Sequence, residues 1–239
     1  MTIDSNIELS LVLPAYNEAP SLRGAVQECL GALSRLGLSH ELIIVNDCST
    51  DSTGTIANRL AEEFPAVHVV HNPINLNVGL SLLIGIQASK GKIITHNSVD
   101  LPFDPNQLAS ILPCLDAADF AVVVRKNRQA HSFWRKITSV VHNNIIKFLF
   151  MVNVPDMNFV QVYKRDVLSN VKVKAKSPAF VTPEIIIRAL NSNYKMAEIL
   201  ADFRPRKIGK GNFGKPRDIL WTLADLVSFW IENLFRSRS

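Results

Sequence analysis

Residues 7–18 read IELSLVLPAYNE, a β-prone apolar run that Pro14 ends and that a polar turn follows. A short run of this kind predicts a buried strand that stops at the proline. A second run, ELIIV at 41–45, leads into the polar turn NDCSTD at 46–51. Both stretches therefore predict a strand that opens into a turn rich in hydrogen-bonding side chains.

The alternation of strands and helices continues through the first half of the chain. Further strands are expected at 67–70, 92–95 and 120–124, and helices at 21–36, 51–64, 80–89 and 105–115. Ser21 suits the N-cap of the first helix, and Gly37 suits its end. Short continuous apolar strands predict a parallel sheet that helices cover on both faces. The ligand site of such a sheet lies at the carboxyl ends of its strands, here 14–18, 46–51 and 97–100.

The composition fits one large α/β domain with a modest C-terminal appendage. The 239 residues are 47% hydrophobic and 20% charged. The three cysteines match no metal site by their spacing, and we interpret them as small apolar residues in a reducing compartment. We expect neither a signal peptide nor a membrane-spanning segment, since no window reaches about 18 uncharged apolar residues.

Beyond Arg125 the chain becomes more aromatic and more basic. Residues 132–152 and 218–235 are apolar helix candidates, and the second has acids seven residues apart. This narrow polar edge fits a helix in a membrane interface, with Trp221, Trp230 and Phe235 at the headgroups. It also fits packing on the domain's own core or on a second subunit.

A net charge of +5 and the basic residues between 204 and 217 would attract anionic lipid, phosphorylated ligands or nucleic acid. Nucleic acid is not expected, because the cluster lacks interleaved aromatic residues.

The three turns offer groups that suit a nucleotide. Tyr16 presents a ring for base stacking, and Glu18 and Asp47 present carboxylates to a ribose or base edge. Asp100 follows a buried strand, where it could hold a divalent metal on a diphosphate, with Asn97 or Ser98 as a further ligand. Each turn alone is also explained without a ligand, as a helix cap or a solvated turn. Their shared edge of the sheet favours the nucleotide.

In their order along the chain, these turns resemble the motifs of family 2 glycosyltransferases, which have the Rossmann-like GT-A fold. The nearest group is that of dolichyl-phosphate mannose synthase and the bacterial polyprenyl-phosphate glycosyltransferases. The family motif Pro-x-Tyr-Asn-Glu is present in full, and the motifs Asp-Asp-Gly-Ser-x-Asp and Asn-x-Gly have similar counterparts. Two later family motifs have similar counterparts at residues 156–165 and 206–211. The resemblance covers roughly residues 8 to 230. The matching segments are 14–18, 46–51 and 77–79.

The resemblance implies an α/β fold with a mostly parallel central sheet flanked by helices. It implies a GT-A domain at 1–217, with a nucleotide-sugar half at about 7–125 and an acceptor half at about 126–217. An amphipathic helix at 218–239 follows.

The resemblance also implies the site residues. The nucleotide sugar is expected at Pro14, Tyr16, Glu18, Asp47 and Asp100, and Mg²⁺ or Mn²⁺ at Asp100. Phosphates are expected at Arg204, Arg206 and Lys210, and catalytic roles fall on Asp100, Asp156 and Arg206.

Several positions depart from the family pattern. Ser98 stands where the Asp-x-Asp metal motif has its first acid, and Pro102 replaces a frequent Gln. Gln161 stands where Arg or Lys is usual, and residues 46 and 48 are Asn and Cys instead of Asp and Gly. The metal site therefore depends on Asp100, and the alternatives are basic residues in place of the metal or an inactive family member.

The class of acceptor is predicted from the side chains that could act as a general base. A hydroxyl acceptor needs a general base, whereas a phosphate is already ionised. Only Glu184 and Asp156 are plausible bases, and Glu184 is better explained as the start of a helix after Pro183.

We therefore predict an inverting transferase from a UDP- or GDP-sugar to a polyprenyl phosphate, peripheral on the cytoplasmic face of a membrane. The alternatives are transfer to a saccharide hydroxyl and a catalytically impaired nucleotide-binding or scaffold protein. A homo-oligomer remains open.

Overall fold

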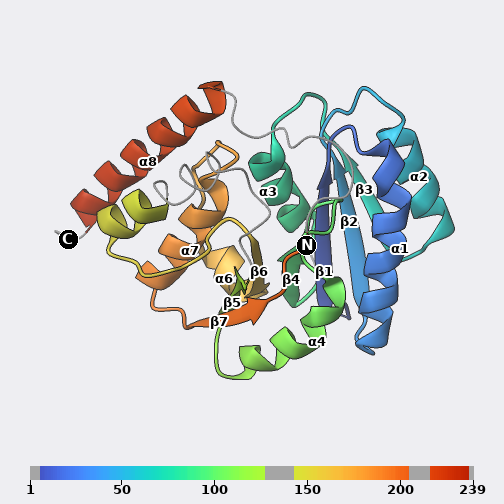
Figure 1. Ribbon diagram of the computed structural model, residues 1–239, viewed down its shortest axis with the longest axis horizontal. Helices are drawn as coiled ribbons and strands as arrows, with labels where there is room; N and C mark the ends of the chain where they lie inside the picture. Colours follow the sequence, from blue (N-terminus) through green and yellow to red (C-terminus); the bar gives the residue numbers. More distant parts are fainter. Residues whose placement is uncertain (1–5, 127–142, 205–215, 237–239) are drawn as a thin grey trace.

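The computed structural model describes residues 6–126, 143–204 and 216–236 (Figure 1). Its strands are β1 (Leu9–Ala15), β2 (His40–Asn46), β3 (Val67–His71), β4 (Ile93–His96), β5 (Phe120–Arg125), β6 (Val160–Lys164) and β7 (Met196–Ala201). Its helices are α1 (Ala19–Arg35), α2 (Thr53–Glu63), α3 (Val78–Ala88), α4 (Leu108–Ile111), α6 (Arg165–Asn170), α7 (Val181–Asn191) and α8 (Pro216–Arg236). Residues 143–150 are also helical.

The strands form one mixed sheet in the order β3-β2-β1-β4-β6-β5-β7. β3, β2, β1 and β4 run parallel, and so do β5 and β7. β6 runs antiparallel between β4 and β5. The expected α/β fold with a mostly parallel sheet is therefore confirmed. The carboxyl ends of β1, β2 and β4 meet at one edge.

Alternating side chains of the central strands enter two separate cores, which explains their continuous apolar runs. Leu11 and Leu13 of β1 pack with Leu22 and Leu60 from α1 and α2 on one face. Val12 packs with residues of β2 and α3 on the other face. Figure 1 shows α1 and α2 on one side of this part of the sheet and α3 on the other.

A third core joins the later helices to β5 and β6. The ring of Phe229 in α8 lies 5.0 Å from that of Phe150 and 5.9 Å from that of Phe180, between centroids. Tyr163 of β6 stacks on Phe120 of β5 in the same cluster. The C-terminal helix therefore packs one of its faces on its own domain. Within the described residues, no helix is both long and apolar enough to cross a membrane.

Two expected helix boundaries are wrong. The first helix begins at Ala19 rather than at a Ser21 cap, with Pro20 in its opening turn, where proline's fixed φ suits a helix. Its end is as expected, because Gly37 follows the helix with a φ of 68°. The helix expected at 105–115 is a four-residue α4 between two 3₁₀ turns, each of which contains a proline.

Helix α3 approaches the sheet most closely at Gly85. A Cβ atom built on Gly85 would lie 2.2 Å from Cγ1 of Val12 and 3.0 Å from Cγ2 of Val45. Gly85→Ala is therefore expected to lower the free energy of unfolding by about 1–3 kcal/mol, measured by urea denaturation. The matched control is Gly24→Ala in α1, where a Cβ meets nothing within 4 Å and helix propensity predicts a small gain. Equal midpoints for the two variants would contradict this packing.

Candidate active site

The turns after β1 and β2 are locked together through Asn17. Its φ of 54° lies in the left-handed region that asparagine tolerates. Its Oδ1 accepts from the backbone N–H of Thr50 at 2.8 Å, and its own N–H donates to Oγ of Ser49 at 3.0 Å. Asn17 therefore joins two turns that are more than thirty residues apart in the chain. This fixes Tyr16 and Glu18 relative to the end of β2.

The starts of α1 and α2 share the same network. The N–H of Glu18 donates to Oγ1 of Thr53 at 2.9 Å, and Oδ1 of Asp51 accepts from the N–H of Thr53 at 2.9 Å. Asp51 thus satisfies a backbone N–H at the start of α2, as its position predicted. The side chain of Glu18 makes no capping bond to α1, and both Tyr16 and Glu18 are half-buried at this edge.

Asp47, at the carboxyl end of β2, is almost fully buried and holds the loop that leads to α3. Its Oδ1 accepts from Nδ2 of Asn72 and from the N–H of Leu76, both at 2.8 Å. Asn72 also donates to Oγ of Ser81 in α3 at 2.9 Å. Asp47 therefore does not cap α2. Its carboxylate lies at the edge of the sheet, where β2 ends. Sequence reasoning missed Asn72, although it too follows a strand.

The Asn-x-Gly segment joins the start of α3 to the segment before α7. Oδ1 of Asn77 accepts from the N–H of Gly79 at 2.9 Å and caps α3, while its Nδ2 donates to the carbonyl of Lys176 at 2.9 Å. A Cβ on Gly79 would lie 2.9 Å from the carbonyl oxygen of Ser177. The motif is thus explained by a helix cap and by a close backbone approach.

The third turn follows β4 and contains the expected metal ligands. Asn97 is buried, its Nδ2 donates to the carbonyl of Phe103 at 2.8 Å, and its Oδ1 accepts from the N–H of Ser98 at 3.0 Å. Its amide therefore shapes the turn, whereas Ser98 and Asp100 are half-buried. The described residues contain no group of three His, Cys, Asp or Glu side chains that could hold a metal. One carboxylate fits an Mg²⁺ or Mn²⁺ ion only if a diphosphate supplies further ligands.

Asp156 is paired with Arg125, a residue that sequence reasoning missed. Nε and Nη2 of Arg125 lie 2.7 and 2.9 Å from the two carboxylate oxygens of Asp156, which is 1% exposed. The guanidinium lies 5.1 Å from the ring centroid of Phe159 and 5.7 Å from that of Phe203. The signal in the sequence was an arginine at the end of the apolar strand β5. The pair suits an orienting role for Asp156 better than that of a base.

Gln161 and His96 form a second polar pair beside the third turn. Nε2 of the fully buried Gln161 donates to the carbonyl of Met157 at 3.0 Å, so its Oε1 accepts from Nε2 of His96 at 2.8 Å. Burial lowers the pKa of His96, against the opposite effect of this hydrogen bond. The imidazole is therefore neutral near pH 7, with its proton on Nε2.

A cavity of about 120 Å³ opens at this edge of the sheet. Pro14 of β1, His96 of β4, Ser98 and Thr182 of α7 line it, together with Gly79 of α3. The structure thus brings Pro14 and the third turn to one cavity, at the sheet edge where the sequence predicted a ligand.

The remaining expected residues lie elsewhere or are already bound. Arg204 contacts the carboxylates of Glu28 in α1 and Asp104, so its predicted role with phosphate remains a prediction. Arg206 and Lys210 lie outside the described residues. Glu184 is 1% exposed, and its Oε2 accepts from the N–H of Ala175 at 2.6 Å while Arg188 lies 2.7 Å from its Oε1. It is therefore not available as a base in this structure.

Two curated proteins with similar sequences have names that state a polyprenyl-phosphate acceptor. Dodecaprenyl-phosphate galacturonate synthase of Rhizobium johnstonii is 27% identical over 237 residues, which cover 98% of this chain and 69% of that protein. Undecaprenyl-phosphate 4-deoxy-4-formamido-L-arabinose transferase of Pectobacterium carotovorum subsp. carotovorum is 28% identical over 171 residues, or 70% of this chain. The match spans only 52% of the second relative, so this chain corresponds to part of a longer protein there.

Solved structures share the fold at low identity. Glucosyl-3-phosphoglycerate synthase of Mycobacterium tuberculosis, in complex with Mn²⁺ and UDP, matches with a TM-score of 0.68 at 18% identity, over 95% of this chain and 81% of that chain. A mannosyltransferase of Pyrobaculum calidifontis, in complex with GDP-Man and Mn²⁺, matches with a TM-score of 0.65 at 15% identity. The match covers 98% of this chain and 66% of that chain.

These neighbours have the GT-A fold. The sequence model of Glycosyl transferase family 2 matches residues 10–170, which include the three turns and the pair of Arg125 and Asp156. On this evidence the chain belongs to glycosyl transferase family 2.

Proposed function

We propose that this protein is an inverting glycosyltransferase that moves a sugar from a UDP- or GDP-sugar to a polyprenyl-phosphate acceptor. The donor part of the proposal rests on the interlocked turns at one sheet edge, with Pro14, Tyr16, Glu18 and Asp47 around the nucleoside. The acceptor part is supported by the two relatives, whose names state polyprenyl-phosphate acceptors.

The observation that carries the acceptor class is the state of the two candidate bases. Asp156 and Glu184 are both buried, and each is paired with an arginine. The oxygens of these carboxylates already accept hydrogen bonds from the arginines, so neither side chain is positioned to take a proton from an acceptor hydroxyl. An acceptor phosphate needs no base: its oxygen attacks the anomeric carbon while the bond to the donor diphosphate breaks. The electron pair of that bond leaves on the β-phosphate, and no proton moves.

The leaving diphosphate needs positive charge near it. We propose that Asp100 holds Mg²⁺ or Mn²⁺ with the diphosphate, with Ser98 or Asn97 as a further ligand, and that Arg206 and Lys210 contact phosphate. The ion supplies charge stabilisation for the leaving group. A cytoplasmic location at a membrane surface is part of the proposal, and the free Cys29, Cys48 and Cys114 agree with a reducing compartment.

Calorimetric titration with UDP and GDP, each with and without Mg²⁺ or Mn²⁺, tests the donor site. We expect one nucleotide to bind, with an affinity that the metal raises, and we expect Asp100→Ala to abolish the metal-dependent gain. The matched control is Asp116→Ala, which removes an exposed carboxylate from the 3₁₀ turn after α4. If neither nucleotide binds under any condition, the altered motifs have removed the donor site, and the scaffold alternative replaces the proposal.

A transfer assay then separates the two acceptor classes. We expect sugar transfer to a detergent-solubilised polyprenyl phosphate and none to soluble saccharides. Transfer to a saccharide hydroxyl alone would identify the alternative acceptor and would require a base other than Asp156 and Glu184.

A further inference from the structure

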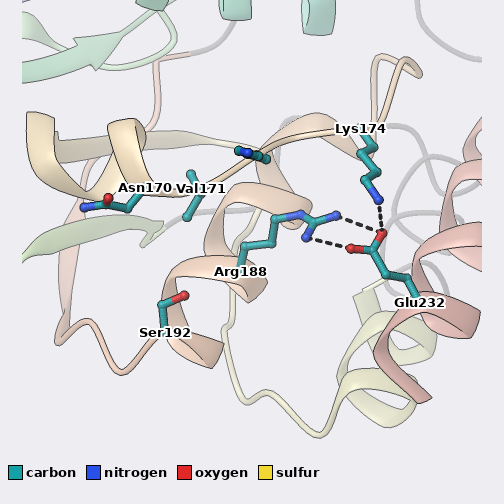
Figure 2. A pocket seen from close by; sticks show the side chains of 7 residues that line it. Asn170, Val171, Lys174, Arg188, Ser192 and Glu232 are labelled. Atoms are coloured by element: carbon teal, nitrogen blue, oxygen red, sulfur yellow. Dashed lines mark hydrogen bonds and ion pairs between the residues drawn. The ribbon is translucent and has the colours of Figure 1, made fainter. Parts of the chain in front are cut away.

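Helix α8 turns its acidic residues toward the protein. Oδ2 of Asp225 accepts from the backbone N–H groups of Lys176 and Ser177 at 2.9 and 2.7 Å. One turn from the end of the helix, Glu232 pairs with Arg188 at 3.1 Å and with Lys174 at 3.0 Å. Figure 2 shows the side chains of Arg188 and Lys174 directed at Glu232. These contacts fix the rotation of α8 about its axis, and Phe229 and Leu226 are buried beside them.

The opposite face of α8 is apolar and exposed. Leu220, Leu223, Val227 and Ile231 recur at helical spacing, and between 45% and 66% of each is exposed. A water-facing helix normally shows the reverse arrangement, with its acids outside and its leucines inside. An exposed apolar patch of this kind marks an interaction site.

The helix at 143–150 packs against the buried face of α8. The contact between the rings of Phe150 and Phe229 places it against α8, and Figure 1 shows the two helices at the same end of the molecule. Phe148 is 83% exposed and Met151 is 93% exposed. Because Phe229 lies on the buried face of α8, the α8 apolar surface is defined by Leu220, Leu223, Val227 and Ile231 alone.

The charge of the chain favours an anionic partner for the α8 apolar surface. Asp225 and Glu232 are engaged by the protein, whereas the guanidinium of Arg217 lies 4.1 Å from the ring centroid of Trp221 at the start of the helix. In the sequence, the segments 127–142 and 205–215 lead into the two helices and contain seven Lys and Arg and no acid. Such a chain, with net charge +5, is attracted by anionic lipid, whereas a second copy is repelled.

We propose that the α8 apolar surface binds flat on an anionic lipid bilayer. Because the other face of α8 is held by ion pairs and buried rings, the helix lies in the interface rather than within the bilayer. The inference deepens the proposed function, since a lipid-phosphate acceptor would reach the acceptor half of the domain from that bilayer. The segment around Lys176 and Ser177, which binds Asp225 of α8, also contacts Asn77 and Gly79 at the cavity.

Vesicle flotation of the full chain tests the proposal without donor or acceptor. We expect binding to phosphatidylcholine vesicles that contain phosphatidylglycerol, and weaker binding to phosphatidylcholine alone. Leu220→Ser combined with Val227→Ser is expected to weaken the partition by about tenfold or more, because each substitution removes a large exposed apolar side chain from α8. The matched control is Ile74→Ser combined with Leu200→Ser, which removes two side chains that are 62% and 64% exposed elsewhere on the molecule.

Three results would overturn the proposal: no binding of the unaltered chain, equal loss in both double variants, or a lipid-free dimer that only the first double variant dissociates. Light scattering in lipid-free buffer detects the dimer, which would assign the α8 apolar surface to a second copy. Nucleotide titration distinguishes the two proposals. Vesicle binding without nucleotide binding would leave this inference standing and remove the proposed transferase, and the converse result would do the opposite.

Discussion

Replacing Arg125 by methionine is expected to lower the free energy of unfolding by about 3–5 kcal/mol, the usual effect of removing one partner from a buried ion pair. The carboxylate of Asp156 is 1% exposed, and two nitrogen atoms of Arg125 bind its two oxygens. Methionine retains much of the volume but leaves the carboxylate without that guanidinium. The contacts of the guanidinium with the rings of Phe159 and Phe203 are lost as well.

Urea denaturation at neutral pH measures this effect, and the neighbouring residue provides the control. Nζ of Lys126 lies 3.9 Å from Asp202, and both side chains are at least 48% exposed. Such an exposed pair contributes little, so Lys126→Met should change the free energy of unfolding by less than about 1 kcal/mol. Arg125→Met combined with Asp156→Asn should recover part of the loss, because the variant no longer buries a charge. A loss below about 1 kcal/mol for Arg125→Met alone would show that the pair is not a main support of this edge.

The order of the three turns along the chain was sufficient to predict their shared position. Parallel strands end at the same edge of a sheet, so Pro14, Asp47 and Asp100 had to lie on one side once the strands were recognised. The Asn-x-Gly segment was also predictable as a helix start. What could not be predicted is the bond from Asn77 to Lys176, because it joins residues 99 positions apart.

The pairing of Arg125 with Asp156 was beyond sequence reasoning for a related reason. β6 enters the sheet antiparallel between β4 and β5, and this reversal brings the residues before β6 to the end of β5. The pattern of apolar runs predicted parallel strands, and it contained no sign of the antiparallel direction of β6 or of its two neighbours. Residue 156 was found only through the family resemblance, and Arg125 was not found at all.

The C-terminal helix was predicted with nearly the right bounds and with its acids on one edge, but its orientation was left open. Acidic residues usually face water, so periodicity alone favours an outward polar edge. The partners that reverse this preference are Arg188, Lys174 and the N–H groups of 176 and 177, all from another part of the chain. The orientation of α8 about its axis is explained by those contacts and by the buried ring of Phe229.

Replacing Asp47 by alanine is expected to weaken nucleotide binding by about 10- to 100-fold, which corresponds to about 1.5–3 kcal/mol for hydrogen bonds to a charged group. Two effects add. The variant removes the carboxylate that we propose for the nucleoside, and it frees the loop that Asn72 and Leu76 attach to Oδ1. Isothermal titration with the nucleotide that the unaltered chain prefers measures the change, with Asp116→Ala as the control.

Asp47→Asn separates the two effects, because an amide keeps an oxygen for Asn72 and Leu76 but loses the negative charge. If Asp47→Asn binds nucleotide as weakly as Asp47→Ala, the carboxylate itself contacts the nucleoside, and the donor site lies at the end of β2. If Asp47→Asn binds as tightly as the unaltered chain and only Asp47→Ala is weak, the residue acts by anchoring the loop. Full affinity in both variants would show that Asp47 does not contribute to nucleotide binding. The turn after β1 would then be the proposed contact of the nucleoside.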